Sequence, residues 1–115
     1  MEDAQAVALF QEVLATTRAG RIPWEPSVGD TLLAAIKGKR TLILKSYTET
    51  DSYGNEHGWP SLSVRDASDR ELLRVTSDLQ DVRVDQLQEL YETARRQAFK
   101  VDEQVQDLLS DLRNL

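Results

Sequence analysis

The chain has 115 residues, of which 40% are hydrophobic and 30% are charged, and its formal net charge is −6. This length suits one domain with one hydrophobic core, and the composition is globular rather than disordered. The negative charge disfavours nucleic acid as a partner, because phosphate contacts supply most of the affinity of nucleic-acid binders. The sequence contains no cysteine, which excludes disulfides, thiolate metal sites and cysteine nucleophiles and fits a cytoplasmic location.

An amphipathic helix is predicted from Asp3 to about Ala19, and Gly20 is suited to ending it. Its apolar residues recur at the spacing of one helix face: Val7, Phe10, Val13 and Leu14. These residues are spaced rather than continuous, and Glu2 and Asp3 stand where a signal peptide would be basic. The segment is therefore expected to be neither a leader nor a membrane span.

Four strand-like segments follow, and the connections between them favour an antiparallel meander. Gly38 and Lys39 suit a type II′ hairpin turn, because glycine supplies the positive φ that the first central position needs. The longest connection, from Glu49 to Gly58, is rich in turn-forming residues and is expected to form an exposed hairpin tip. The four segments are Thr31–Lys37, Arg40–Thr48, Trp59–Asp66 and Glu71–Thr76.

The residue patterns predict that helices cover only one face of this sheet. In the third segment Leu62 and Val64 alternate with polar residues, which gives one apolar face and one wet face. In the second segment three aliphatic residues are consecutive, so Ile43 is expected on the uncovered face. Trp24, in the linker before the first strand, is expected to be a buried anchor rather than a binding platform.

The last segment carries a heptad pattern of apolar residues that continues to the final residue. An unbroken helix of about 30 residues would be roughly 45 Å long, whereas strands of roughly six to eight residues span only about 20 to 27 Å. Three arrangements therefore stay open: the distal half packs on the first helix, it meets a second copy or a partner, or the helix breaks near 99–101 and Asp102 caps a final short helix. The stripe consists of Leu87, Tyr91, Ala94, Ala98, Val101, Val105, Leu108, Leu112 and Leu115.

Motifs that carry catalysis or cofactor binding do not appear in the sequence. His57 is the single histidine, and it lies in a loop with Asp51 and Glu56 without the spacing typical of a zinc site. The sequence has neither a Gly-x-Ser-x-Gly element nor a phosphate-binding glycine loop. We therefore expect no enzyme activity, no metal and no cofactor.

Recognition of another protein is the function that these features favour. Tyr53, at the expected hairpin tip, is of a residue type enriched at binding hot spots. Ile43 would add an apolar contact on the uncovered sheet face. On the heptad stripe, the distal residues extend farthest beyond the sheet. The residues predicted to contact a partner are Ile43, Tyr53, Val105, Leu108 and Leu112.

The predicted partner is a protein, and the acidic second half of the chain favours a basic one, because opposite charges steer association. A second copy of the chain is a further candidate, whereas no membrane partner is expected. The compact basic run of the chain comprises Lys37, Lys39, Arg40 and Lys45. A small acidic chain with an antiparallel sheet bracketed by helices resembles, at fold level, secretion chaperones and toxin-immunity proteins. The resemblance implies an immunity protein, a chaperone-like protein or a regulatory subunit.

The sequence thus predicts one α+β domain over residues 1–115, with a helix, a four-stranded antiparallel meander and a long C-terminal helix on one sheet face. The competing hypothesis is a small-molecule binding or enzymatic domain. Its pocket would lie between the sheet and the helices, with Tyr47, Arg65 and His57 as polar contacts.

Overall fold

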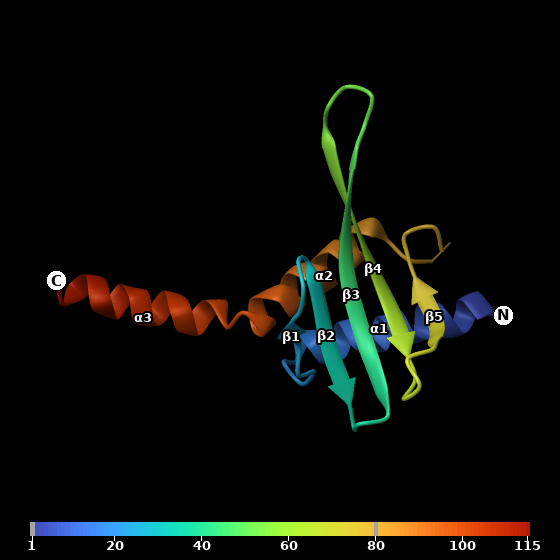
Figure 1. The fold of residues 1–115 in the computed structure, drawn as a ribbon, viewed down its shortest axis with the longest axis horizontal. Coiled ribbons are helices and arrows are strands. Elements are labelled where there is room, and N and C mark those ends of the chain that lie inside the picture. Colours follow the sequence, from blue (N-terminus) through green and yellow to red (C-terminus); the bar gives the residue numbers. More distant parts are fainter. Residues whose placement is uncertain (1, 80) are drawn as a thin grey trace.

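The fold is of the α+β class, as predicted: an N-terminal helix, an antiparallel sheet and two C-terminal helices follow one another along the chain (Figure 1). The computed structural model describes residues 2–79 and 81–115. Neighbouring strands are all antiparallel, and their order in the sheet is their order in the chain. The elements are α1 (Glu2–Arg18), β1 (Glu25–Pro26), β2 (Thr31–Ile36), β3 (Arg40–Thr50), β4 (Glu56–Arg65), β5 (Glu71–Val75), α2 (Val84–Ala98) and α3 (Val101–Arg113).

The sheet has five strands rather than the predicted four, because the linker after α1 contributes an edge strand. In β1, Glu25 pairs with Leu33 and Pro26 with Leu32 of β2. Proline masks this strand in the sequence, since it lacks the N–H that a central strand needs, but an edge strand tolerates it. The meander is otherwise as predicted, with one edge strand added.

Both turns of the long central strands differ in detail from the prediction. At the β2–β3 turn the amide of Lys39 donates to the carbonyl of Ile36, and Lys37 and Gly38 both have positive φ, 52° and 69°. Positive φ at both central residues is typical of a type I′ turn, so the predicted type II′ turn at Gly38-Lys39 is wrong. The β3–β4 strands run on through the predicted loop, and only residues 51–55 connect them.

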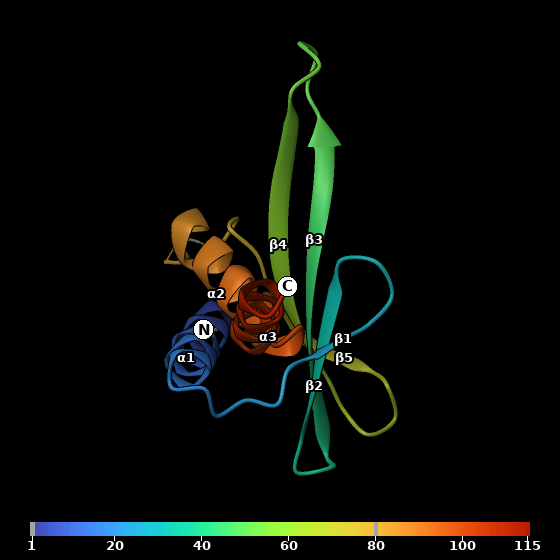
Figure 2. The same ribbon diagram turned by 90° about the vertical axis from the view of Figure 1, so that its left-hand side faces the viewer.

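The hydrophobic core lies between α1 and α2 and one face of the sheet, and Figure 2 shows both helices on that face. The register explains which residues enter it, because Ala34, Leu42 and Val64 are cross-strand neighbours and so point to the same side. The largest fully buried side chains are Phe10, Leu14, Leu32, Leu44, Leu62, Leu87, Leu90, Val75 and Thr17.

Trp24 ties the linker to α1, which confirms its predicted role as a buried anchor. Its indole Nε1–H donates to the hydroxyl of Thr17 at 3.0 Å. The Thr17 carbonyl in turn accepts from the Gln97 side chain at 2.7 Å, so this position joins α1, the linker and α2. A buried indole N–H needs such an acceptor, because leaving it unpaired costs free energy.

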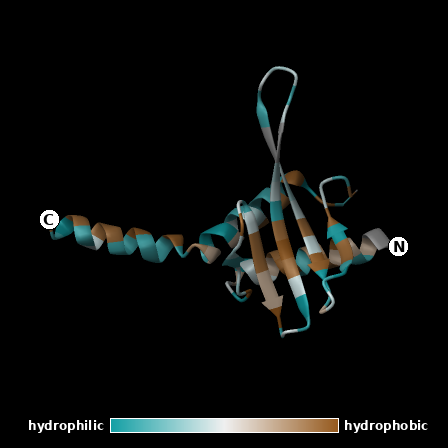
Figure 3. Cartoon of the chain, in the orientation of Figure 1, coloured by the Kyte–Doolittle hydropathy of each residue, from teal (hydrophilic) through white to brown (hydrophobic). Residues whose placement is uncertain are grey.

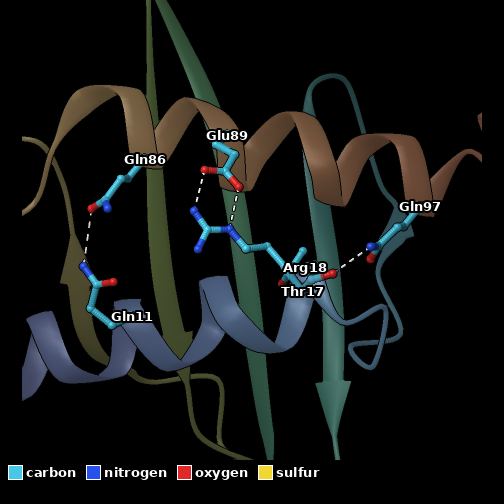
Figure 4. A network of polar contacts seen from close by, with 6 residues as sticks. All are labelled: Gln11, Thr17, Arg18, Gln86, Glu89 and Gln97. Atoms are coloured by element: carbon cyan, nitrogen blue, oxygen red, sulfur yellow. Dashed lines mark hydrogen bonds and ion pairs between the residues drawn. The ribbon is translucent and has the colours of Figure 1, made fainter.

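Polar side chains join α1 and α2 along their exposed seam (Figure 4). The Arg18 guanidinium donates two hydrogen bonds to Glu89, at 2.6 and 2.7 Å, and Gln11 donates to Gln86 at 3.3 Å. The hydrogen bond from Arg18 lowers the pKa of Glu89 and raises the pKa of Arg18 itself. The pair is solvent-exposed, so it aligns the helices more than it stabilises them.

Two projections extend from this body: the distal β3–β4 hairpin and α3 (Figures 1 and 2). They make the chain less compact than a typical single domain of this length. Its radius of gyration is 16.1 Å, against about 13 Å for a compact domain of similar length. Much surface is therefore presented away from the core.

We predict that T17V destabilises the protein by about 1 to 3 kcal/mol, because the indole N–H of Trp24 loses its acceptor while the packing volume is kept. Urea denaturation measures this cost. Adding W24F to T17V should cost less than adding it to the wild type, since the donor is then absent too. Equal costs in both backgrounds would contradict the assigned hydrogen bond.

Because of the Arg18–Glu89 pair, we expect part of the free energy of unfolding to be lost in acid. The pKa of Glu89 is lower in the folded chain than in the unfolded one. Its contribution is therefore complete above the unfolded pKa, about 4.3, and is lost as the pH falls through the folded pKa. The melting temperature of E89Q should lie slightly below that of the wild type at pH 7, and the difference should vanish near pH 3. E92Q, on the same helix but outside this pair, should show no such convergence.

Candidate interaction surfaces

The C-terminal apolar stripe is divided between two helices by a break at Phe99 and Lys100. Lys100 has a left-handed backbone, with φ 52° and ψ 46°, which ends α2 and redirects the chain into α3. Of the three arrangements left open by the sequence, the break near 99–101 is present. The predicted cap is wrong: Lys100 is the N-cap of α3, and Asp102 lies in its first turn, where it pairs with Arg96 at 2.7 Å.

The two halves of the stripe have different environments. On α2, Leu87 and Ala94 are buried in the core, and Tyr91 and Ala98 pack against it. On α3 no described residue is buried. Figure 1 shows α3 directed away from the body, so the alternative in which the distal half packs on α1 does not hold.

The exposed face of α3 brings together three of the five predicted contact residues. Val105, Leu108 and Leu112 are 45%, 57% and 53% exposed, and they follow one side of the helix over two turns. Figure 3 shows the apolar bands along this projecting helix. We call Val105, Leu108 and Leu112 the α3 stripe.

Polar and aromatic contacts at the break hold α3 in its outward direction. Besides the Arg96–Asp102 pair, the side chain of Gln104 donates to the carbonyl of Phe99. The Arg95 guanidinium lies over the Phe99 ring at 5.6 Å from its centroid. The Gln104 bond pairs a carbonyl that the end of α2 leaves free, and the other two contacts join side chains across or beside the break.

The uncovered sheet face carries Ile43, as predicted. Ile43 lies in one cross-strand row with Leu33 and Ser63, opposite in alternation to the buried Leu42 and Leu44. Both Ile43 and Leu33 are half-buried. The apolar area at this place is thus modest, and the partner contact of Ile43 stays a prediction.

An aromatic pair extends the uncovered face toward the long hairpin. Tyr47 and Trp59 are direct cross-strand partners and are 44% and 40% exposed. Together with Ser61, Arg74 and Asp78 they line a pocket of about 360 Å³. The pocket lies on the face that points away from the helices.

Tyr53 lies at the tip of the β3–β4 hairpin and is 89% exposed, so its predicted surface position is confirmed. The Asp51 carboxylate accepts from the backbone amides of Tyr53 and Asn55, each at 2.9 Å, which fixes the shape of the tip. Tyr53, Ile43 and the α3 stripe lie on three separate parts of the molecule. The structure therefore does not combine all five residues into one surface.

The small-molecule pocket predicted from Tyr47, Arg65 and His57 is not formed as expected. Tyr47 and Arg65 both lie on the uncovered face, not between sheet and helices. Tyr47 pairs with Trp59, six residues before Arg65 on β4, so about 20 Å separate the two positions. The side chain of His57 lies outside the described residues.

A groove that sequence reasoning missed lies between α1 and the end of the β2–β3 hairpin. Its volume is about 410 Å³. Its walls are mainly aliphatic, and three cations of the basic run lie at its rim. The sequence showed the basic run but not that α1 would lie beside it. The lining residues include Leu9, Val13, Ile22, Ile36, Leu42, Val64, Lys37, Lys39 and Arg40.

Neither a metal site, a membrane-spanning helix nor a known relative points to a function for the described part of the chain. Among residues 2–79 and 81–115, no three metal-ligating side chains converge. No helix in that part of the chain has the length and apolar character needed to cross a bilayer. Comparison with protein-family models, curated proteins and solved structures finds no match.

Because α3 buries no residue, we predict that L108D/L112D leaves the melting temperature of the body within about 2 °C of the wild type. Y53A should behave in the same way, since Tyr53 is almost fully exposed. L90A provides the contrast, because Leu90 is fully buried and its truncation costs about 2 to 5 kcal/mol. Measured at a concentration at which the chain is monomeric, a drop of several degrees in L108D/L112D would mean that the stripe packs on the body of its own chain.

Proposed function

We propose that this chain is a non-enzymatic protein–protein interaction module and that α3 is its docking helix. The observation that carries the proposal is the α3 stripe, three aliphatic side chains about half exposed on a helix that projects from the body. The roles that we propose for such a module are those of an immunity protein, a chaperone-like protein or a regulatory subunit.

The energetics of α3 support a bound partner. A helix of 13 residues is marginal in water by itself, since most helical stability in proteins comes from packing an apolar face. Burying the exposed parts of Val105, Leu108 and Leu112 would contribute on the order of 1 kcal/mol each. A partner groove that covers them would therefore stabilise both the helix and the complex.

The spacing of the stripe matches a known mode of recognition. Positions 105, 108 and 112 correspond to i, i+3 and i+7, the anchor spacing of amphipathic helices that bind in apolar grooves. Acidic side chains surround the stripe: Asp102, Glu103, Asp107 and Asp111 outnumber the single base Arg113. The preferred partner is thus an apolar groove with a basic rim.

The other exposed elements fit auxiliary roles. Tyr53 projects at the hairpin tip, and the Tyr47–Trp59 pair flanks a pocket on the uncovered face. Large aromatic side chains of this kind often anchor interfaces. The β3–β4 hairpin that carries them points in a different direction from α3 in Figure 1, so they would extend an interface rather than form its centre.

The test compares two variants that add the same charges to opposite sides of α3. L108D/L112D introduces two aspartates on the stripe, and Q106D/S110D introduces two at the same spacing on the other side. Quantitative cross-linking of tagged chains in their native cells should lose the associated proteins for L108D/L112D and keep them for Q106D/S110D.

If both variants recover the associated proteins equally, at equal expression and melting temperature, α3 is not the docking helix.

A further inference from the structure

The groove between α1 and the β2–β3 hairpin has the features that the α3 stripe requires of a partner. Its walls include Leu9 and Val13 from α1 and Ile36 from β2. Leu9 and Ile36 are only partly buried, so apolar surface is still open to a ligand. Lys37, Lys39 and Arg40 are exposed along the hairpin side of the same groove.

The groove and the stripe match in length. The α1 residues that line the groove run from Leu9 to Thr16, which is about 10.5 Å along the helix axis at ~1.5 Å per residue. The α3 stripe runs from Val105 to Leu112 and covers the same rise. The stripe can therefore contact the α1 side of the groove along its whole length.

The charges match as well. Asp107 and Asp111 are one turn apart on α3, next in sequence to Leu108 and Leu112. When the stripe faces the groove, these two carboxylates come beside its rim, where the hairpin places Lys37 and Lys39. Glu12 is the acidic side chain among the lining residues, set against three cations.

The groove of the same chain is out of reach of its own α3. The chain turns at the left-handed Lys100, beside the Arg96–Asp102 pair, and no described residue of α3 is buried. Figure 1 shows α3 extending from the body beyond the end of α1. A stripe held outward and a matching groove on the body can meet only between two chains.

We propose that two copies of this chain associate by exchanging α3, so that the α3 stripe of each copy binds the groove between α1 and the β2–β3 hairpin of the other. This inference rests on the proposed function and names its partner as a second copy. Reciprocal exchange forms two identical contacts in a closed pair, which is the commonest symmetry of protein oligomers.

The test is a charge swap monitored by sedimentation velocity over a concentration series. D107K/D111K and K37E/K39E should each weaken self-association about ten-fold or more, because each places like charges together at the rim. The combined variant D107K/D111K/K37E/K39E restores the formal net charge of −6 and should recover association to within about three-fold of the wild type. K45E is the control, since Lys45 belongs to the same basic run but lies on the uncovered sheet face.

The sign of the D107K/D111K effect separates a local contact from general repulsion. Two acidic chains repel, so a variant with less negative charge should associate more strongly if only net charge mattered. Weaker association therefore supports a contact at the basic rim.

Two results would overturn the exchange. One is a chain that stays monomeric at every concentration. The other is an oligomer that L108D/L112D disrupts but the charge variants do not, which would mean that two α3 helices pack on each other. In either case the cross-linking comparison of L108D/L112D with Q106D/S110D still decides whether α3 binds a different protein.

Discussion

The last apolar stripe of the chain is longer than the sheet face that it helps to cover, and the arrangement of the molecule follows from where this stripe is divided. The helices α1 and α2 cover most of the sheet face between them and leave the groove beside the β2–β3 hairpin open. Beyond Ala98 the stripe has no sheet to cover, and the left-handed Lys100 ends the helix there. The first half of the stripe becomes core and the second half becomes an exposed surface.

The left-handed backbone of Lys100 is unfavourable in itself, and contacts around the break offset part of its free-energy cost. A non-glycine residue in this conformation loses roughly 1 kcal/mol or more relative to a helical one. The Arg96–Asp102 pair and the Gln104–Phe99 hydrogen bond compensate part of this cost, because both form only when the chain turns at this position. The break therefore aims α3 in a fixed direction, which lowers the entropy that a docking helix must lose on binding.

Much of this fold could be predicted from the sequence, because its signals are local. Alternation in β4 and the consecutive aliphatic residues around Ile43 identified both sheet faces, and the stripe length left a break near Lys100 as one of three possible arrangements. The edge strand at Glu25–Pro26 could not be predicted, because proline argues against a strand and only the pairing with β2 forms it. The Gly38 turn was placed correctly but given the wrong type, because one glycine fits two turn types.

The candidate sites were less predictable than the fold, because a site depends on which segments meet. The α3 stripe could be found from spacing alone, since its three residues share one helix. The groove could not, because its walls come from α1, the linker and the sheet, up to 55 positions apart between Leu9 and Val64. From the sequence alone, the basic run Lys37-Gly38-Lys39-Arg40 cannot be distinguished from an ordinary solvent-exposed turn. The structure places an aliphatic wall beside it. In the proposed exchange, the charge would select the ligand and apolar burial would supply the affinity.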